Sequence, residues 1–280
     1  MANEKWQIIL ASSLIIISNA PMADIVIREC VTIDELDNCI RLQREVFGLP
    51  DLEISPRRHL IVSRQAGGWT LGAFVGERLV GFVHHLVAVR GVSEIFGYSH
   101  MMAVDPAFQN QGVGARLKWS QRERAIQEGR GFIKWTWDPL QARNAHFNLN
   151  RLGVTASSYA ANFYGTDYAT SPLLTNVAPA GIDSDRLFAH WQLESPRVIS
   201  LATGTPAPGE NVGEPEATID IPTDWTKLCR ENPAQAKQEQ SRVRAEFQQA
   251  FAAGLVAAGF ERSAEQPRYL LYTEEDLQSP

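Results

Sequence analysis

The chain has 280 residues, of which 44% are hydrophobic and 21% charged, and its formal net charge at pH 7 is −6. This composition excludes a largely disordered chain, and the length allows one large domain or two. The negative charge argues against a nucleic-acid-binding surface and fits a cytoplasmic protein. The three cysteines form no Cys-x-x-Cys pair, which argues against a zinc or disulfide framework and favours a reducing compartment.

Residues 1–22 contain an apolar run at 8–17 that follows Lys5, a pattern similar to a signal peptide. The run is shorter than the ~20 apolar residues that cross a bilayer, and Glu4 dilutes the positive charge ahead of it. Met22 stands directly before a strand-like pattern. We therefore interpret residues 1–22 as a leader or an over-extended gene start, and we expect no membrane association.

The next segments predict a strand, two helices and a three-stranded meander. Alternating apolar residues predict a strand at 25–29, and Thr32 with Glu35 forms a capping box for a helix that ends at Gly48. A short helix is expected at 59–65. Three strands joined by glycine-containing turns are then predicted at residues 69–75, 79–89 and 95–104.

A glycine-rich loop follows the third meander strand. Asp105 and Pro106 end that strand, and Gly112 and Gly114 precede a helix that runs to about Glu128. Because glycine has no Cβ, the backbone N–H groups of residues 110–115 can converge at the positive end of the helix dipole. This arrangement predicts an anion site suited to a pyrophosphate. A P-loop is excluded because the helix start lacks Gly-Lys-Ser/Thr.

The helix after this loop has two apolar faces. Val113 and Leu117 lie on one side, whereas Trp119 and Ile126 lie on the other with Ala115. One face would cover a sheet. We expect the C-terminal segment to cover the second.

The remainder of the chain predicts further strands and a C-terminal extension. A strand is expected at 132–137, a helix at 141–152 and a late strand at 187–193, followed by a Pro/Gly-rich linker at 199–216. The extension, residues 217–280, reads as β-α-β: a strand at 217–221, a long helix and a strand at 268–272. The long helix is expected to begin at the N-cap Asn232, with Pro233 first, and to end at Gly259.

The loop pattern Gln109-x-x-Gly112-x-Gly114, after a strand ending Met-Ala-Val-Asp-Pro, resembles the coenzyme A loop of the GNAT acyltransferases, the general-control-related N-acetyltransferases. The resemblance covers a domain at 23–198 and implies an α+β or α/β fold, with a mixed, mostly antiparallel central sheet flanked by helices. The expected element order is β-α-α-β-β-β-α-β-α-β-β. Acetyl-CoA is implied as the acyl donor, held between the strands before and after the loop, and no metal is implied.

The resemblance also assigns residues to coenzyme A. The expected contacts are Met102, Val104, Gln109, Asn110, Gln111, Gly112, Val113, Gly114, Ala115 and Asn144.

Period-2 alternation places Tyr98, His100, Met102 and Val104 on one face of their strand. His100 resembles the histidine base of the arylalkylamine-acetylating branch, and an ordinary imidazole pKa near 6.5 suits a base at neutral pH. The alternative is a hydrogen-bonded sheet histidine. His84 and His85 compete for the role, and alternation points them to opposite faces.

Residues 144–154 resemble the family pattern Asn-Ala-x-x-x-Tyr-x-Lys-x-Gly-Phe, but the tyrosine that donates a proton to sulfur falls on Leu149. Either Tyr98, Tyr159 or Tyr164 is the acid, or the thiolate leaves unassisted, or transfer is slow. We expect an acetyl-CoA-dependent N-acetyltransferase acting on a small amine or amino-acid-like substrate. The alternative is a CoA-binding, catalytically weak regulatory or interaction protein. No nucleic-acid partner is expected, and a homodimer stays open.

Overall fold

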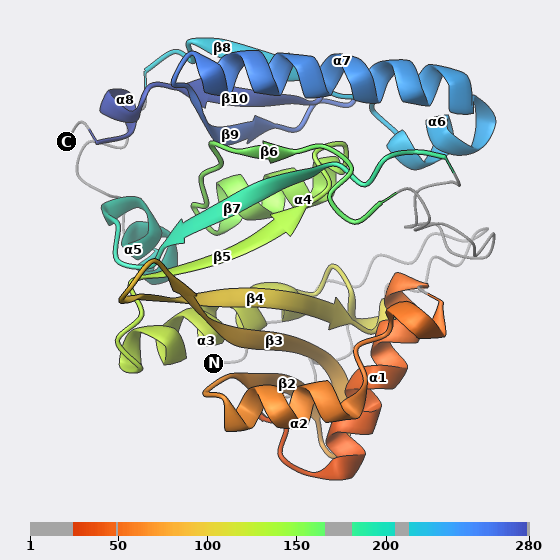
Figure 1. Cartoon of the computed structure of the whole chain (residues 1–280), viewed down its shortest axis with the longest axis vertical. Coiled ribbons are helices and arrows are strands. Elements are labelled where there is room, and N and C mark those ends of the chain that lie inside the picture. The colour runs from red at the N-terminus through yellow and green to blue at the C-terminus, as the bar shows by residue number, and fades with distance from the viewer. Residues whose placement is uncertain (1–24, 49, 166–180, 205–212, 279–280) are drawn as a thin grey trace, which may run out of the picture.

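The computed structural model describes residues 25–48, 50–165, 181–204 and 213–278, so the predicted leader at 1–22 lies outside the described residues. The central element is a seven-stranded sheet with the order β1-β2-β3-β4-β5-β7-β6 (Figure 1). Its strands are β1 (Ile25–Glu29), β2 (Trp69–Val75), β3 (Arg78–Arg90), β4 (Glu94–Val104), β5 (Phe132–Trp137), β6 (Tyr159–Ala160) and β7 (Arg186–Gln192). Among the strands described, β4 and β5 pair in parallel and every other neighbouring pair of the sheet is antiparallel. The predicted mixed, mostly antiparallel sheet is confirmed.

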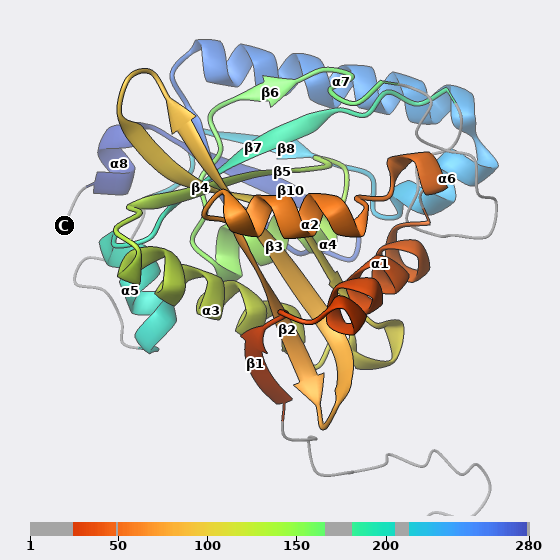
Figure 2. The same cartoon turned by 60° about the horizontal axis from the view of Figure 1, so that its bottom comes forward.

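Two helices cover one face of the β1–β4 half. Helix α1 (Ile33–Phe47) begins at the Thr32 capping box and ends at Gly48 in the left-handed conformation, as predicted. Helix α2 (Arg57–Gln65) follows the short 3-10 helix η1 (Asp51–Glu53). Figure 2 shows both helices lying over β2–β4. Their apolar residues enclose one core cluster with side chains from the strands: Cys30, Leu36, Cys39, Leu42, Leu60, Phe74, Leu79, Phe82 and Ala103.

Helix α3 (Val113–Gln127) covers the opposite face, reached through the 3-10 helix η2 (Pro106–Phe108). Val113 and Leu117 pack there in a second cluster with Trp69 and Val83. This confirms one of the two predicted apolar faces of the helix.

The covering of the other face of α3 was predicted wrongly. Trp119 lies 5.5 Å, centroid to centroid, from Trp191 of β7, and the elements that chiefly contact α3 are β1 to β5. The C-terminal segment lies at the other end of the molecule (Figure 1). The second apolar face of α3 therefore packs against the sheet itself, where Trp119 meets Trp191 of β7.

After β5 the chain forms α4 (Ala142–His146), which passes directly into the π-helix η3 (Phe147–Arg151). This segment confirms the helix predicted at 141–152, although its second half has π geometry. Helix α5 (Pro196–Thr203), which begins at the Ser195 N-cap, was not predicted. It includes the start of the linker predicted at 199–216, so that boundary is corrected.

The C-terminal unit is a three-stranded antiparallel sheet, β8-β10-β9, with helices on it. Its elements are β8 (Ala217–Asp220), α6 (Trp225–Glu231), α7 (Pro233–Ala252), β9 (Val256–Glu261), β10 (Arg268–Tyr272) and α8 (Glu274–Gln278). The Asn232 N-cap is confirmed, since its side chain accepts from Gln235 N. The predicted end of α7 at Gly259 is wrong: the helix ends at Ala252, Gly254 turns the chain with φ 83°, and Gly259 lies within β9.

Specific contacts join this unit to η3 and to the segments that follow β5 and precede β6. Ala257 pairs with Ala156 as an isolated bridge, and Phe260 N donates to Asn150 Oδ1 at 3.0 Å. The buried Tyr269 hydroxyl donates to Pro139 O at 2.7 Å. One continuous core cluster therefore includes residues of β5, β7, η3 and the C-terminal unit.

Candidate functional site

The loop between β4 and α3 is fixed by its own polar side chains. Asp105 accepts hydrogen bonds from Ala107 N at 3.0 Å and from Arg78 at 2.7 Å. Gln109 Nε2 donates to Val104 O at 3.0 Å, and Gln111 Nε2 donates to Ala107 O at 2.8 Å. The two glutamines thus shape the loop through their side chains, leaving its backbone to meet a ligand.

The end of this loop has the geometry of an anion site. Asn110 and Gly112 have φ angles of 61° and 80°, and a Cβ at Gly112 would meet nothing within 4 Å. Helix α3 has no side-chain N-cap hydrogen bond, and its first backbone bond runs from Arg116 N to Gly112 O. The N–H groups of residues 113–115 are therefore left to an external acceptor at the positive end of the helix dipole. A pyrophosphate fits this arrangement.

Strands β4 and β5 diverge beside this loop. They pair only at Gly97–Ile133 and Tyr98–Lys134, whereas β4 continues to pair with β3 as far as Val104 (Figure 1). Among the described residues, β5 therefore offers no backbone partner to residues 99–104 of β4. These residues extend over roughly 17 Å, at ~3.3 Å per residue. The pantetheine arm of coenzyme A has about a dozen chain atoms between the pyrophosphate and the sulfur. When extended it is about as long as four to five residues of extended polypeptide, which is similar to the length of this stretch of β4.

A β-bulge in β4 overturns the predicted common face. His84 pairs with Met101 and His85 with Ser99, so His100 is the extra residue on β4. Met102 and Val104 pack with the α3 cluster, whereas His100 points to the α1/α2 face. A bulge shifts the alternation by one residue, which a strict period of two cannot anticipate. Met102 and Val104 can thus meet a ligand through their backbone edges, while their side chains support α3.

His100 lies where β4 and β5 diverge, and its neighbours are polar or aromatic. Its Nε2 is hydrogen-bonded to Ser55 Oγ at 3.2 Å, and its ring centroid lies 5.6 Å from that of His59 and 6.1 Å from that of His84. The side chain remains accessible to solvent. Partial desolvation, and secondarily charge on His59, lower the pKa of His100 from its ordinary value. The imidazole is therefore neutral, and able to accept a proton, at neutral pH.

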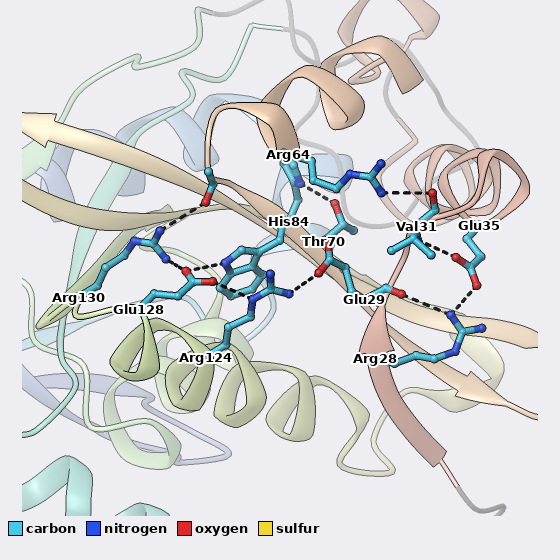
Figure 3. A network of polar contacts seen from close by, with 12 residues as sticks. Arg28, Glu29, Val31, Glu35, Arg64, Thr70, His84, Arg124, Glu128 and Arg130 are labelled. Carbon is cyan, nitrogen blue, oxygen red and sulfur yellow. Dashed lines mark hydrogen bonds and ion pairs between the residues drawn. The ribbon is translucent and has the colours of Figure 1, made fainter.

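His84 and His85 point to opposite faces, as predicted, and both are fully buried. His84 contacts Thr70 Oγ1 at 2.8 Å and Ser63 Oγ at 3.1 Å (Figure 3 shows the Thr70 contact). His85 stacks on Trp69 with centroids 4.1 Å apart. Burial is the main cause that lowers the pKa of His84 to about 3 and that of His85 to about 2. These hydrogen bonds and this stacking hold both rings, so we assign both histidines a structural role.

Two of the three candidate tyrosines lie together. Tyr164 OH is 3.3 Å from Thr136 Oγ1 on β5, and Tyr98 is close enough to Tyr164 to interact with it. Burial, followed by the charge that Tyr164 would carry, raises the pKa of Tyr98 to about 12. Tyr159 is instead engaged elsewhere, since its hydroxyl donates to Asp185 Oδ2 at 2.5 Å. Tyr98 and Tyr164 thus remain near the divergence, and Tyr159 is structural.

Leu149 and Asn144, the two residues assigned from the sequence pattern at 144–154, lie in different environments. Leu149 is fully buried in the large core cluster, with no hydroxyl to offer. Asn144 is exposed on α4, one residue from Arg143, whose guanidinium donates to Gln109 Oε1 at 3.2 Å. This contact ties α4 to the loop. Ser55 and His59 were not predicted, because only the folded structure brings these residues, distant in sequence, beside His100.

A charged network fixes the far end of α3. Arg124 forms ion pairs with Glu29 of β1 at 2.7 Å and with Glu128 at 3.0 Å (Figure 3). Glu128 also accepts from Trp69 Nε1 at 3.0 Å and pairs with Arg130. The helix is therefore held at its C-terminal end by the sheet, while its N-terminal end is left to a ligand.

Comparison with known proteins places this site in a family. The model of the acetyltransferase (GNAT) family matches residues 35–153, which include the loop, the diverging strands and α4. Residues 35–153 are a GNAT acetyltransferase domain. The sheet order and the sequence β-α-α-β-β-β-α-β-α-β-β agree with the GNAT fold expected from the loop.

Solved structures similar to this chain include several acetyltransferases. The ribosomal-protein-S18-alanine N-acetyltransferase from Escherichia coli is 12% identical with a TM-score of 0.47, over 61% of this chain and 95% of that one. A GNAT family acetyltransferase from Elizabethkingia anophelis with acetyl-CoA bound is 15% identical with a TM-score of 0.43, over 60% and 97%. An aminoglycoside acetyltransferase from an uncultured soil metagenomic sample is 22% identical with a TM-score of 0.39, over 44% and 84%. No curated protein matches the chain.

GNAT acetyltransferases take their acyl group from acetyl-CoA, and the free N–H groups at α3 together with the unpaired edge of β4 fit that donor. Among the described residues, no cluster of three or more His, Cys, Asp or Glu side chains is arranged to bind a metal ion. No helix within the described part is both long and apolar enough to cross a bilayer.

Proposed function

We propose that this protein is an N-acetyltransferase that moves the acetyl group of acetyl-CoA directly to a small amine or amino-acid-like substrate. The observation that carries the proposal is the alignment of two unpartnered backbone features, the start of α3 and the edge of β4 over residues 99–104. An extended ligand with a pyrophosphate at one end and amides along its length satisfies both.

The proposed binding residues divide by the groups they use. The N–H groups of Val113, Gly114 and Ala115 would hold the pyrophosphate, with Asn110 and Gly112 supplying the left-handed turns that expose them. Met102 and Val104 would contribute backbone groups along the pantetheine arm. Gln109 and Gln111 would act by fixing the loop, and Asn144 would reach the ligand from α4.

His100 is the proposed base. An amine substrate is mostly protonated at neutral pH and must lose a proton before its lone pair can attack the acetyl carbon. The His100 imidazole lies next to the divergence of the strands, is accessible, and is neutral because its pKa is lowered. Tyr98 and Tyr164, which lie on the same face as His100, are proposed to position the acceptor amine.

A second function is favoured by one observation. Leu149 occupies the position of the usual hydroxyl donor and is fully buried, so the chain lacks the acid that the family pattern supplies there. A CoA-binding regulatory protein with slow transfer would tolerate this loss. The two proposals differ in turnover and share the same ligand.

The deciding experiment measures free thiol released from acetyl-CoA in the presence of amines of different classes: arylalkylamines, aminoglycosides, amino acids and peptides with a free α-amino group. Acetyl-CoA is also added alone in a thermal unfolding assay. We expect stabilisation by acetyl-CoA and amine-dependent thiol release with at least one class. Stabilisation without thiol release would support the regulatory protein, and no stabilisation would contradict both.

A further inference from the structure

Lys118 of α3 is a buried lysine without a carboxylate partner. Only 3% of the residue is exposed, and no ion pair to it is found among the described residues. Its Nζ donates to Ser99 Oγ at 2.7 Å and to Gln121 Oε1 at 3.1 Å, and it lies 3.6 Å from the centroid of the Trp135 ring. An unpaired lysine in such a place is costly, because burial disfavours the charged form.

The position of this ammonium in the sheet is specific. Tyr98 and Lys134 are the last residues at which β4 and β5 pair. Ser99 and Trp135 are the next residue on each strand, and Lys118 Nζ contacts both. Lys118 therefore closes the apex of the divergence from the α3 side, on the face opposite to His100.

The geometry points to Lys118 as the proton donor to the sulfur of coenzyme A, in place of the hydroxyl that Leu149 lacks. This inference rests on the proposed function, since it needs an acyl thioester in the divergence. The roughly 17 Å from the start of the α3 loop back along β4 to Ser99 matches the reach of the pantetheine arm.

The reaction needs two proton transfers, one on each face of the sheet. When the amine nitrogen bonds to the acetyl carbon, the carbon–sulfur bond breaks and its electron pair goes to sulfur. Lys118 Nζ–H gives a proton to that sulfur and becomes a neutral amine. The proton that the attacking amine loses goes to His100, and solvent restores the proton on Lys118. Burial lowers the pKa of Lys118 from its ordinary value, which makes the ammonium a better acid for a thiolate.

The charged and titratable groups near Lys118 come from two directions. His85 of β3 contacts Gln121 Nε2 through Nδ1 at 3.2 Å, and Arg130, which follows α3, lies 3.4 Å from His85 Nε2. Arg124 and Glu128 lie beyond them at the end of α3. Gln121 and Ser99 are neutral, and Trp135 offers only its ring. Among these charged and titratable groups, Lys118 is the one in contact with Ser99 and Trp135, where β4 and β5 diverge.

The test uses the full chain with Lys118→Met, Lys118→Arg and, as a matched control from the same buried network, Gln121→Met. Three quantities are measured: stabilisation by acetyl-CoA, turnover at saturating substrates, and the pKa of the bound CoA thiol from the ultraviolet absorbance of its thiolate. Methionine keeps the length of the chain without its charge. Arginine keeps the charge but holds its proton too tightly to donate it.

We expect Lys118→Met to bind acetyl-CoA, to lower turnover by ~10²-fold and to raise the pKa of the bound thiol. Lys118→Arg should keep the thiol pKa low but remain slow, and Gln121→Met should leave the thiol titration unchanged. A folded Lys118→Met or Lys118→Arg variant with the turnover of the wild type would overturn the assignment. A wild-type chain that acetyl-CoA does not stabilise would instead overturn the proposed function, and the assignment with it.

Discussion

The two halves of the central sheet are built in different ways. The β1–β4 half is sandwiched between two small clusters, and polar side chains such as His84, His85 and Lys118 are buried within it. The β5–β7–β6 half shares one large, aromatic-rich core with α4 and the C-terminal unit. Within the described residues, the backbone pairing between the halves consists of two residue pairs of β4 and β5. The candidate site thus lies at the edge of the β1–β4 half, where His84, His85 and Lys118 are buried, while the other half packs mainly through its aromatic core.

The prediction with the largest expected effect concerns the large core of the β5–β7–β6 half. Phe247 of α7 is fully buried and contacts Tyr269, Tyr159 and Phe251. Phe247→Ala should lower the free energy of unfolding by ~3–5 kcal/mol, because it leaves a cavity in this core. Urea unfolding measures the loss. Because the α3 loop belongs to the other half, the folded variant should still be stabilised by acetyl-CoA, and loss of that stabilisation would show that the halves are not separable.

The second prediction tests the loop. At a hundred times its dissociation constant, acetyl-CoA should stabilise the wild type by about 2.7 kcal/mol, and Gly112→Asp should abolish this gain. The new side chain enters space that is open in the protein but faces the expected pyrophosphate, and it carries a repelling charge. Gly91→Asp is the matched control, since Gly91 also has a positive φ and open surroundings in the β3–β4 turn. Equal ligand stabilisation in the two variants would place the anion site elsewhere.

His100→Gln tests the chemistry of the polar half. The variant should still bind acetyl-CoA, but its turnover should fall by ~10²-fold or more. In the wild type, the rate should fall as the pH drops through the lowered pKa of His100, because the protonated ring cannot accept a proton. The variant should lose this acid limb in a pH–rate measurement. Ser55→Ala, which removes only the hydrogen bond to His100, should retain the limb. An unchanged rate and profile in His100→Gln would assign the ring a structural role.

The last prediction concerns stability in acid. The folded-state pKa values of His84 and His85, about 3 and about 2, lie below the ordinary value of 6.5. The unfolded chain therefore binds more protons, and stability present above pH ~6.5 is lost as the pH falls toward the folded values. Each histidine should contribute ~1.4 kcal/mol per pH unit in this window. Urea unfolding between pH 7 and 4 should show a shallower slope in His84→Gln, and an identical slope would contradict the burial of a neutral ring.

The sequence predicted most of the fold where local signals are strong. The capping box at Thr32, the alternation in β1 and the apolar and aromatic residues of β2 and β5 are local signals, and the predicted bounds agree with the structure. The end of α7 was misplaced because Val256–Glu261 is rich in alanine and glycine, which are poor strand formers. Pairing with β10 decides its conformation, and that partner is not visible in a local window.

The candidate site was predicted less completely, for two physical reasons. The loop could be predicted from its glycines, because glycine is the residue favoured at backbone positions with a positive φ angle. The bulge at His100 gives no such sequence signal, so Met102 and Val104 were wrongly assigned to the same face as His100. Lys118 could not be recognised because lysine is normally exposed, and only the packing of α3 on β4 and β5 shows that it is buried.

The short strand β6 has a consequence for association between molecules. It is the last strand of the seven-stranded sheet and contains only Tyr159 and Ala160. Helix α7 packs beside it, and Ala156 just before it pairs with Ala257 of the C-terminal sheet. An exposed sheet edge is a template on which strands of other molecules can add and start aggregation. Because the C-terminal unit covers this edge, β6 is not available for the addition of a strand from another molecule.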